Sequence, residues 1–413
     1  MSWKMRYGRT WGRLGMIYKT YTMENALEAI IDYRGKTPKK ADTGIPALSA
    51  KSVKNNYIDY NACYYISPEE YKRFMVRGKP QKGDILLTTE APMGMVACLD
   101  RDDVAIAQRL LTLRGKENIL DNNYLLYYLQ SPIGQALLRA RETGTTVTGI
   151  KQSEFKKIQI SIPDIEVQRK IETILRTIDK KIVVNESINR NLLEQLDALY
   201  DNWFGKYKPF NIGIGGDPGY ALEDGWQIRD IYSIAEVIYG APFTSKKFNT
   251  EGKGKPIVRI RDLKNQELCT YTPEEHPKGY LLQPGDIVVG MDGEFRPYIW
   301  GNEEAWLNQR VCVFNNVRKN GKAYVYCTIK PLLYSVETTE VATTVIHIGK
   351  KDYDEFRVVL PPEDILVEFE AVSKPIFDRI VEGQLENRRL TKLRNGLLPK
   401  LMSGELDVSY LNV

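Results

Sequence analysis

The chain has 413 residues, of which 43% are hydrophobic and 27% are charged, as is typical of a globular protein with two or three domains. Its formal net charge is +5, and it lacks a run of about 18 apolar residues, so we expect no membrane span. Five scattered cysteines without a CxxC pair favour a reducing cytoplasm, and two histidines argue against a histidine-rich metal site, so we expect no metal.

Residues 1–20 are predicted to form a basic N-terminal extension. Lys4, Arg6, Arg9 and Arg13 occur there without the apolar core of a signal peptide. Such a segment is either an arm that touches nucleic-acid phosphates or, as we expect, a disordered or upstream extension.

A first globular block is predicted for residues 21–160. Short β-rich runs lie between turn signals such as Lys82-Gly83-Asp84. A helical stretch follows and breaks at Ser131-Pro132, because proline is favoured in the first turn of a new helix. A last strand precedes Pro163, so the block is predicted to be α+β.

A long helix is predicted within residues 161–207, the central helical region. Its apolar and amide side chains recur in alternating steps of four and three, the a/d pattern of a helix that packs against another helix. At ~1.5 Å per residue the stripe from Ile171 to Trp203 is ~48 Å long, so it needs a partner. The seam residues are Ile171, Leu175, Ile178, Ile182, Asn185, Asn189, Leu192, Leu196 and Leu199.

The partner is predicted within residues 361–413, where the same seam reappears 198 positions later. Asn189 maps onto Asn387, and a buried amide at such a position favours one register because it needs a partner. Pro375, Gly383 and Gly396 weaken this second helix, and Pro375 is expected to kink it or to begin a fresh segment. Its seam residues are Phe369, Ile376, Ile380, Asn387, Leu390 and Leu397.

The repeat extends into the globular parts, so residues 208–360 are predicted to hold a linker and a second block. The segment around Gly83-Asp84-Ile85 answers Gly285-Asp286-Ile287, and Thr145-Thr146-Val147 answers Thr343-Thr344-Val345. Gln108-Arg109 also answers Gln309-Arg310, and this recurrence favours a structural role for both pairs. A period this long indicates a duplicated domain and not a solenoid. The glycines of the linker lack the GxGxxG spacing after a strand, so no cofactor is expected there.

Catalytic motifs are missing from the sequence: we find no Walker loop, methyltransferase motif, GxSxG or HExxH. Residues 151–206 and 358–413, which contain the two predicted helices, together hold 17 basic and 18 acidic residues, which leaves the basic excess in the globular blocks. Two copies of a basic block on a spacer favour a bipartite nucleic-acid reader over an enzyme, although such an excess is also compatible with ordinary scatter.

Several segments resemble the specificity subunits of type I restriction–modification systems, from about residue 24 to the end of the chain. They are "TGTTVTGIKQSEFKKIQISIPDIEVQRKIETILRTIDKKI", "NRNLLEQLDALYDNWF", "ENRRLTKLRNGLLPKLMSGEL", "IIDYRGKTPKK" and "EVIYGAPFTSKKFN". The resemblance implies two tandem α/β target recognition domains, each followed by a long helix, with the two helices packed as an antiparallel coiled coil. The irregular second seam, with Gly383, Arg394 and Gly396, departs from this pattern.

The resemblance also implies partners. The chain would bind a split, asymmetric site on double-stranded DNA and dock the modification (methyltransferase) subunits and the restriction (translocase and nuclease) subunit. S-adenosylmethionine, ATP and Mg would act in those partner subunits, and this chain would be non-catalytic and bind no cofactor itself.

Basic and polar residues on each block are the candidates for DNA contacts, because cations meet phosphates and a smaller set of side chains reads base edges. The candidates are Arg34, Lys36, Lys39, Lys40, Lys51, Lys54, Thr88, Thr89, Lys246, Lys247, Arg259, Arg261, Lys264, Asp292 and Arg296. Two alternatives stay open: a fused enzyme, which would need methyltransferase motifs, and a non-catalytic duplicated scaffold that binds protein.

Overall fold

The computed structural model describes residues 17–144, 148–205, 222, 224–318, 321–339 and 347–411. The basic residues at 4–13, the repeated motifs at 145–147 and 343–345, and most of the predicted linker lie outside these residues. The chain divides into two compact units, residues 1–180 with 391–413 and residues 181–390. Each unit contains one globular block and parts of both long helices.

The first unit consists of short strands, short helices and the first part of a long helix. Its elements are β1 (Tyr18–Thr22), α1 (Met23–Ala26), β2 (Leu27–Asp32), β3 (Ile45–Leu48), β4 (Val53–Lys54), β5 (Tyr57–Ile58), η1 (Tyr60–Ala62), β6 (Tyr64–Ile66), α2 (Pro68–Phe74), β7 (Ile85–Thr88), β8 (Val96–Cys98), β9 (Ala105–Ile106), β10 (Leu110–Gly115), α3 (Asn122–Gln130), α4 (Pro132–Arg139), α5 (Gln152–Lys156), β11 (Gln159–Pro163) and α6 (Ile165–Phe204). The predicted break at Ser131-Pro132 is confirmed: the Ser131 side chain caps α4 by accepting from the N–H of Gly134, and Pro132 is the first helical residue.

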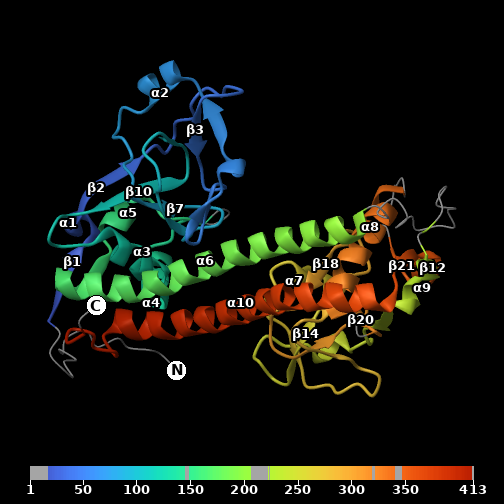
Figure 1. Cartoon of the computed structure of the whole chain (residues 1–413). Coiled ribbons are helices and arrows are strands. Elements are labelled where there is room, and N and C mark those ends of the chain that lie inside the picture. The colour runs from blue at the N-terminus through green and yellow to red at the C-terminus, as the bar shows by residue number, and fades with distance from the viewer. Residues whose placement is uncertain are drawn as a thin grey trace. The chain divides into compact units, whose positions relative to one another are not determined.

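The strands of this unit form a four-stranded antiparallel sheet in the order β2-β10-β7-β8 and a three-stranded sheet in the order β6-β3-β9. The first of these sheets is seen in the blue and teal part of Figure 1. A separate pair joins the two ends of the block, because β1 runs antiparallel to β11 with Tyr21 opposite Ile160. The chain therefore enters and leaves the block at neighbouring points.

The second unit repeats this plan. Its elements are β12 (Gln227–Asp230), η3 (Ile231–Ser233), β13 (Ala235–Tyr239), η4 (Ser245–Lys247), β14 (Lys255–Val258), α7 (Ile260–Leu263), β15 (Tyr271–Thr272), β16 (Leu281–Leu282), β17 (Ile287–Gly290), β18 (Pro297–Ile299), β19 (Ala305–Leu307), β20 (Val311–Asn316), α8 (Gly321–Thr339), α9 (Lys350–Glu355), β21 (Arg357–Leu360) and α10 (Glu363–Ser403). The sheet orders β13-β20-β17-β18 and β15-β14-β19-β16 match those of the first unit, with β16 added at one edge. β12 pairs with β21, and Gln227 lies opposite Leu360. The predicted duplication is confirmed.

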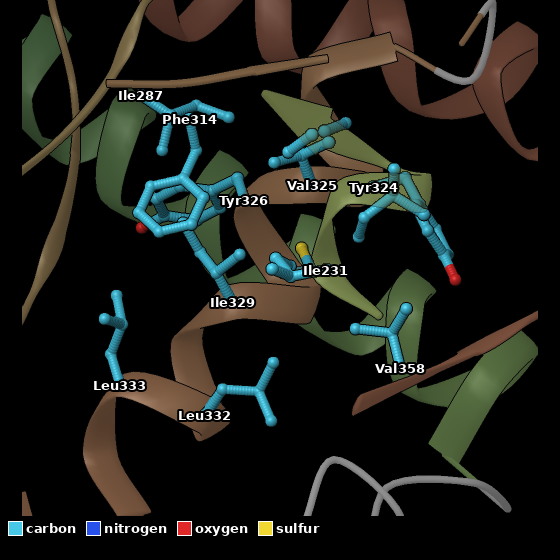
Figure 2. Close-up of a cluster of buried hydrophobic side chains, with 14 of the residues drawn as sticks. Ile231, Ile287, Phe314, Tyr324, Val325, Tyr326, Ile329, Leu332, Leu333 and Val358 are labelled. Carbon is cyan, nitrogen blue, oxygen red and sulfur yellow. The ribbon is translucent and has the colours of Figure 1, made fainter. Parts of the chain in front are cut away.

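The core of the second block packs α8 against its four-stranded sheet. Phe314 from β20 and Ile287 from β17 are fully buried together with Ile329 of α8. Figure 2 shows these side chains with those of Leu332 and Leu333 further along the helix. A buried side chain of this size contributes roughly 1.5–3 kcal/mol, so such a block has a core of its own.

The two long helices pack antiparallel within each unit, as predicted. In the first unit Ile171 and Leu175 of α6 share a core cluster with Leu401 of α10. In the second unit Leu196 of α6 shares a core cluster with Phe369 of α10. Residues late in α6 therefore meet residues early in α10, and all the predicted seam residues are buried or half-buried.

Two details of α10 differ from the prediction. The helix runs without interruption from Glu363 to Ser403, so no fresh segment begins at Pro375. Pro375 lies on the exposed face of the helix. Phe377 is buried in the core although the heptad pattern did not assign it to the seam.

The seam of the second unit contains a cluster of amides. Asn185, only 1% exposed, donates from Nδ2 to Oδ1 of Asn387 at 2.9 Å, and Asn387 donates to the carbonyl of Ile182 at 3.2 Å. Asn189 does not pair with Asn387, to which it corresponds in the repeat; it faces Gly383. A Cβ atom at Gly383 would lie 2.5 Å from Oδ1 of Asn189, so this glycine makes room for the amide. The irregularity of the second seam therefore has a packing cause.

Candidate nucleic-acid interface

One edge of the four-stranded sheet in the first block gathers charged side chains. β2 and β7 both run antiparallel to β10, so they end at the edge where β10 begins. Arg34 follows β2, Glu90 follows β7, and Arg109 immediately precedes β10. The three residues are far apart in the sequence and are brought together by the strand order.

A carboxylate lies at the centre of this group. Oε1 of Glu90 accepts from the guanidinium of Arg34 at 2.7 Å, and Oε2 lies 3.4 Å from Nε of Arg109. Arg34 also donates to Oγ1 of Thr89 at 3.4 Å and to the carbonyl of Ile150 at 3.2 Å, so its Nη2 group has three acceptors. Arg109 is 52% exposed, whereas Glu90 is 24% exposed. With two guanidinium groups and one carboxylate, the group is formally cationic.

The equivalent edge of the second block carries an equivalent group. Asp292 follows β17 and Arg310 immediately precedes β20, and their side chains approach to 3.4 Å. His347 adjoins this pair, since its Nδ1 lies 2.8 Å from Oδ1 of Asp292 and 3.0 Å from the guanidinium of Arg310. Arg310 is 55% exposed.

The two arginines share an unusual backbone conformation. Arg109 has φ of +66° and Arg310 has φ of +71°, in the left-handed region that side chains other than glycine rarely adopt. In both blocks the carbonyl of the arginine accepts from the strand end opposite: the N–H of Thr89 donates to Arg109 at 2.9 Å and that of Met291 to Arg310 at 2.9 Å. The conformation is part of the same turn in both copies.

The two threonine candidates are interior residues. Thr88 is fully buried, and its hydroxyl donates to the carbonyl of Pro92 at 2.6 Å and accepts from the N–H of Met95 at 2.9 Å. Thr89 is 3% exposed and takes a hydrogen bond from Arg34. Their place among the DNA-contact candidates is corrected, because a buried side chain with its hydrogen bonds filled does not reach a ligand.

Two arginine candidates of the second block hold the fold together. Arg259 donates from Nε to Asp262 at 3.0 Å and is only 20% exposed. Arg296 forms an ion pair with Glu337 and lies over the ring of Tyr334. The hydrogen bond from Arg296 lowers the pKa of Glu337, which keeps the pair charged at neutral pH. These contacts account for both arginines within the block.

The remaining candidates are mostly exposed cations. Lys54 is half-buried, and the exposed residues are Lys36, Lys39, Lys40, Lys51, Lys246, Lys247, Arg261 and Lys264. Lys40 lies over the ring of Tyr64, and Lys247 lies 3.8 Å from Glu274. The backbone N–H of Lys39 donates to Glu70 and lowers the pKa of that carboxyl. These lysines stay candidates for phosphate contacts.

Sequence reasoning missed Glu90 and His347 and set Arg109 and Arg310 aside. A signal for the carboxylates was present: Glu90 follows Asp84 by six positions, and Asp292 follows Asp286 by six. His347 and Gly149 correspond in the repeat, so no such signal marks the histidine.

The part of the chain that the structure describes contains neither a group of metal-binding side chains nor a helix that could span a membrane. Its His, Cys, Asp and Glu side chains form no group of three or more that would bind a metal ion. None of its helices has the length and apolarity to cross a bilayer.

The structure contains two similar domains, each with a charged group at the same place in its four-stranded sheet. Comparison with known proteins assigns the class of the protein. The family model described as the type I restriction modification DNA specificity domain matches residues 27–195 and again residues 223–380. The chain belongs to this family of DNA specificity proteins. The predicted role of a non-catalytic specificity subunit is confirmed by this membership.

Curated relatives agree. The chain is 27% identical over 350 residues to the type I restriction enzyme MjaIX specificity subunit of Methanocaldococcus jannaschii. The match covers 80% of this chain and 79% of that protein. It is 29% identical over 194 residues to the EcoBI specificity subunit of Escherichia coli, covering 45% and 40%. The crystal structure of a type I restriction–modification S subunit from M. genitalium matches with a TM-score of 0.57 and 16% identity, over 95% and 98% of the two chains. This last likeness shows a shared fold.

Proposed function

We propose that the chain selects the DNA target of a type I restriction–modification complex by reading a bipartite, asymmetric site, one half with each globular block. The duplication is the observation that carries this proposal. Two copies of one domain share a strand order but differ in sequence, which suits two readers of different sequences.

Within each block the exposed lysines and arginines meet phosphates and orient the DNA, and fewer side chains contact base edges. Phosphate contacts of this kind supply affinity and make it fall with salt. The lysines that are exposed in both blocks are suited to this role, since they have few competing partners among the described residues.

The partners in this proposal are double-stranded DNA, the modification subunits and the restriction subunit. The long helices dock the other subunits in the cytoplasm, and S-adenosylmethionine, ATP and Mg act in those subunits. This chain supplies no cofactor site, so on its own it should transfer no methyl group and hydrolyse no ATP. Methylation of DNA by the purified chain alone would contradict this assignment.

Exchange of one block tests the division of labour. Replacing residues 21–160 with the matching block of a relative joins the chains where Tyr21 lies opposite Ile160, so the cut points adjoin. The expected result is a methylated motif in which only one half has changed. The measurement is methylome sequencing of a host that expresses the exchanged chain with its partner subunits.

The matched control exchanges residues 227–360, whose ends also adjoin because Gln227 lies opposite Leu360. This exchange should alter the other half of the motif and leave the first half intact. If either exchange altered both halves, the independent-reader model would be wrong. A chain that assembles with its partners without gaining affinity for duplex DNA would instead favour the protein-binding scaffold.

A further inference from the structure

The arginine–carboxylate pair at the sheet edge is an exposed charged feature that both blocks keep in the same backbone frame. Besides the bond through the arginine carbonyl, a second cross-bond recurs: the N–H of Ile150 donates to the carbonyl of Thr89, and that of Ile348 donates to Met291, both at 3.0 Å. The neighbours of the pair are not kept, because Arg34 adjoins it in one block and His347 in the other. Both blocks therefore retain the arginine and the carboxylate, although the residues next to the pair differ.

The backbone of each arginine is strained, and the turn does not require an arginine. Glycine populates positive φ at no steric cost, and asparagine does so more readily than arginine. A non-glycine residue in this region is strained, and such strain gathers at functional sites. Since both blocks keep an arginine at this position, its side chain has a use that offsets the strain.

The side chains are arranged to present a cation and not to bury one. Arg109 and Arg310 are more than half exposed, whereas Glu90 and Asp292 are less than a third exposed. Each guanidinium is thus held beside a partly buried carboxylate and open to solvent. A guanidinium restrained in this way loses less entropy when it binds a planar or tetrahedral oxyanion.

The ligand follows from the recurrence. A contact that is identical in two domains cannot carry the difference between two half-sites, so it must address what the half-sites have in common, the sugar–phosphate backbone. We propose that Arg109 and Arg310 each bind a DNA phosphate at an equivalent place in the two half-sites, held in position by Glu90 and Asp292. This inference rests on the function proposed above and assigns residues to it.

The test uses the full chain assembled with its modification subunits and the variants Arg109→Gly and Arg310→Gly, singly and combined. Glycine removes the side chain and relieves the backbone, so the variants should unfold at the same temperature as the unchanged protein or above it. Binding is measured over a salt series on a duplex that carries the methylated motif and on a scrambled duplex. Each variant should bind both duplexes several-fold more weakly, with the slope of log affinity against log salt reduced by about one.

The matched control is Arg101→Ala in the first block, which also removes an exposed, ion-paired arginine. Arg101 pairs with Asp103 in the loop after β8, at the opposite edge of the same sheet. This variant should leave the affinity and the salt slope nearly unchanged. The conservative variant Arg109→Lys should keep most of the affinity, because a phosphate contact requires the charge above all.

The outcomes separate the alternatives. A changed methylated motif in Arg109→Gly or Arg310→Gly would overturn the proposal in favour of base reading. An unchanged affinity, or a loss of stability without a loss of affinity, would overturn it in favour of a purely structural pair. If the unchanged complex bound the motif duplex and the scrambled duplex equally well, the proposed function itself would be wrong. The results for the arginine variants bear only on the phosphate contact, so the two failures can be told apart.

Discussion

At the residue scale, a buried aspartate fixes the turn before the strand that leads to each charged edge. Asp84 is 1% exposed, accepts from the N–H of Gln81 at 2.8 Å and forms an ion pair with Arg114 at 2.7 Å. Asp286 takes the same place in the second block, with Lys322 as its cation at 2.8 Å. The hydrogen bonds that Arg114 donates to the Asp84 carboxylate raise the pKa of Arg114, so the guanidinium stays charged throughout the usual pH range. A buried pair of this kind is costly to break on one side only.

Asp84→Asn is therefore expected to destabilise the protein by roughly 3–5 kcal/mol, because it leaves the Arg114 guanidinium without its counter-charge in a buried place. Denaturant unfolding of the full chain measures this change. The control is Asp103→Asn, whose ion pair with Arg101 is exposed and should cost at most about 1 kcal/mol. Equal losses in the two variants would show that burial of the pair does not matter.

Single residues were the hardest part to predict from the sequence. Thr88 and Thr89 were among the polar candidates, but both are buried: Thr88 lies in β7, whose residues are all buried, and Thr89 directly follows it. Arg259 and Arg296 were chosen for their charge, but Arg259 pairs with Asp262 in the first turn of α7, and Arg296 pairs with Glu337, which is distant in the sequence. Composition gives the chemistry of a side chain, whereas its partners depend on how the strands are ordered.

At the element scale, the heptad pattern gave the right answer for α6 and α10. Period alone predicted which residues of α6 face the partner, since all of them are buried or half-buried. The separate expectation of a fresh segment at Pro375 is wrong, because α10 is continuous through this residue. Gly383 looked like a defect in the sequence, and only the antiparallel register reveals that it faces Asn189.

The two helical glycines of α10 should respond oppositely to alanine. A Cβ atom at Gly396 meets nothing within 4 Å, so Gly396→Ala should stabilise the protein by about 0.5–1 kcal/mol through helix propensity. Gly383→Ala should destabilise it by about 1–3 kcal/mol, because the added methyl group overlaps the Asn189 amide.

Thermal or denaturant unfolding of both variants checks the signs. Removing the amide with Asn189→Ala should make Gly383→Ala harmless in the double variant, since the overlap is then gone. A Gly383→Ala protein as stable as the unchanged one would contradict the steric account.

At the scale of the whole molecule, the continuous helices are expected to set how many unread base pairs separate the two half-sites. Four residues add ~6 Å and rotate a helix by ~40° beyond a full turn, while one base pair adds ~3.4 Å and ~35°. Four residues inserted between 180 and 181 in α6, together with four between 390 and 391 in α10, leave the contacts inside each compact unit unchanged. The gap in the methylated motif should then grow by one or two base pairs while both half-sites stay the same.

The control for this prediction inserts four residues in α6 alone. That change shifts the register of α6 against α10 on one side of the insertion. The ion pairs Asp179–Arg394 and Lys181–Glu386 can then no longer form at the same time. Assembly with the partner subunits should fall sharply. Sequencing of the methylated motif measures the gap in the matched insertion, and an unchanged gap there would mean that the helices are not the ruler.

The amide seam also bears on the ancestry of the chain. The repeat relates Asn185 to Gly383 and Asn189 to Asn387, so the contacts Asn185–Asn387 and Asn189–Gly383 are two versions of one contact. Two copies of the first half, paired in the same way, would place Asn185 opposite Asn189 twice and give a symmetric homodimer. The amide seam therefore has the pseudo-two-fold symmetry of two copies that pair head to tail, broken at the one position where glycine stands for asparagine.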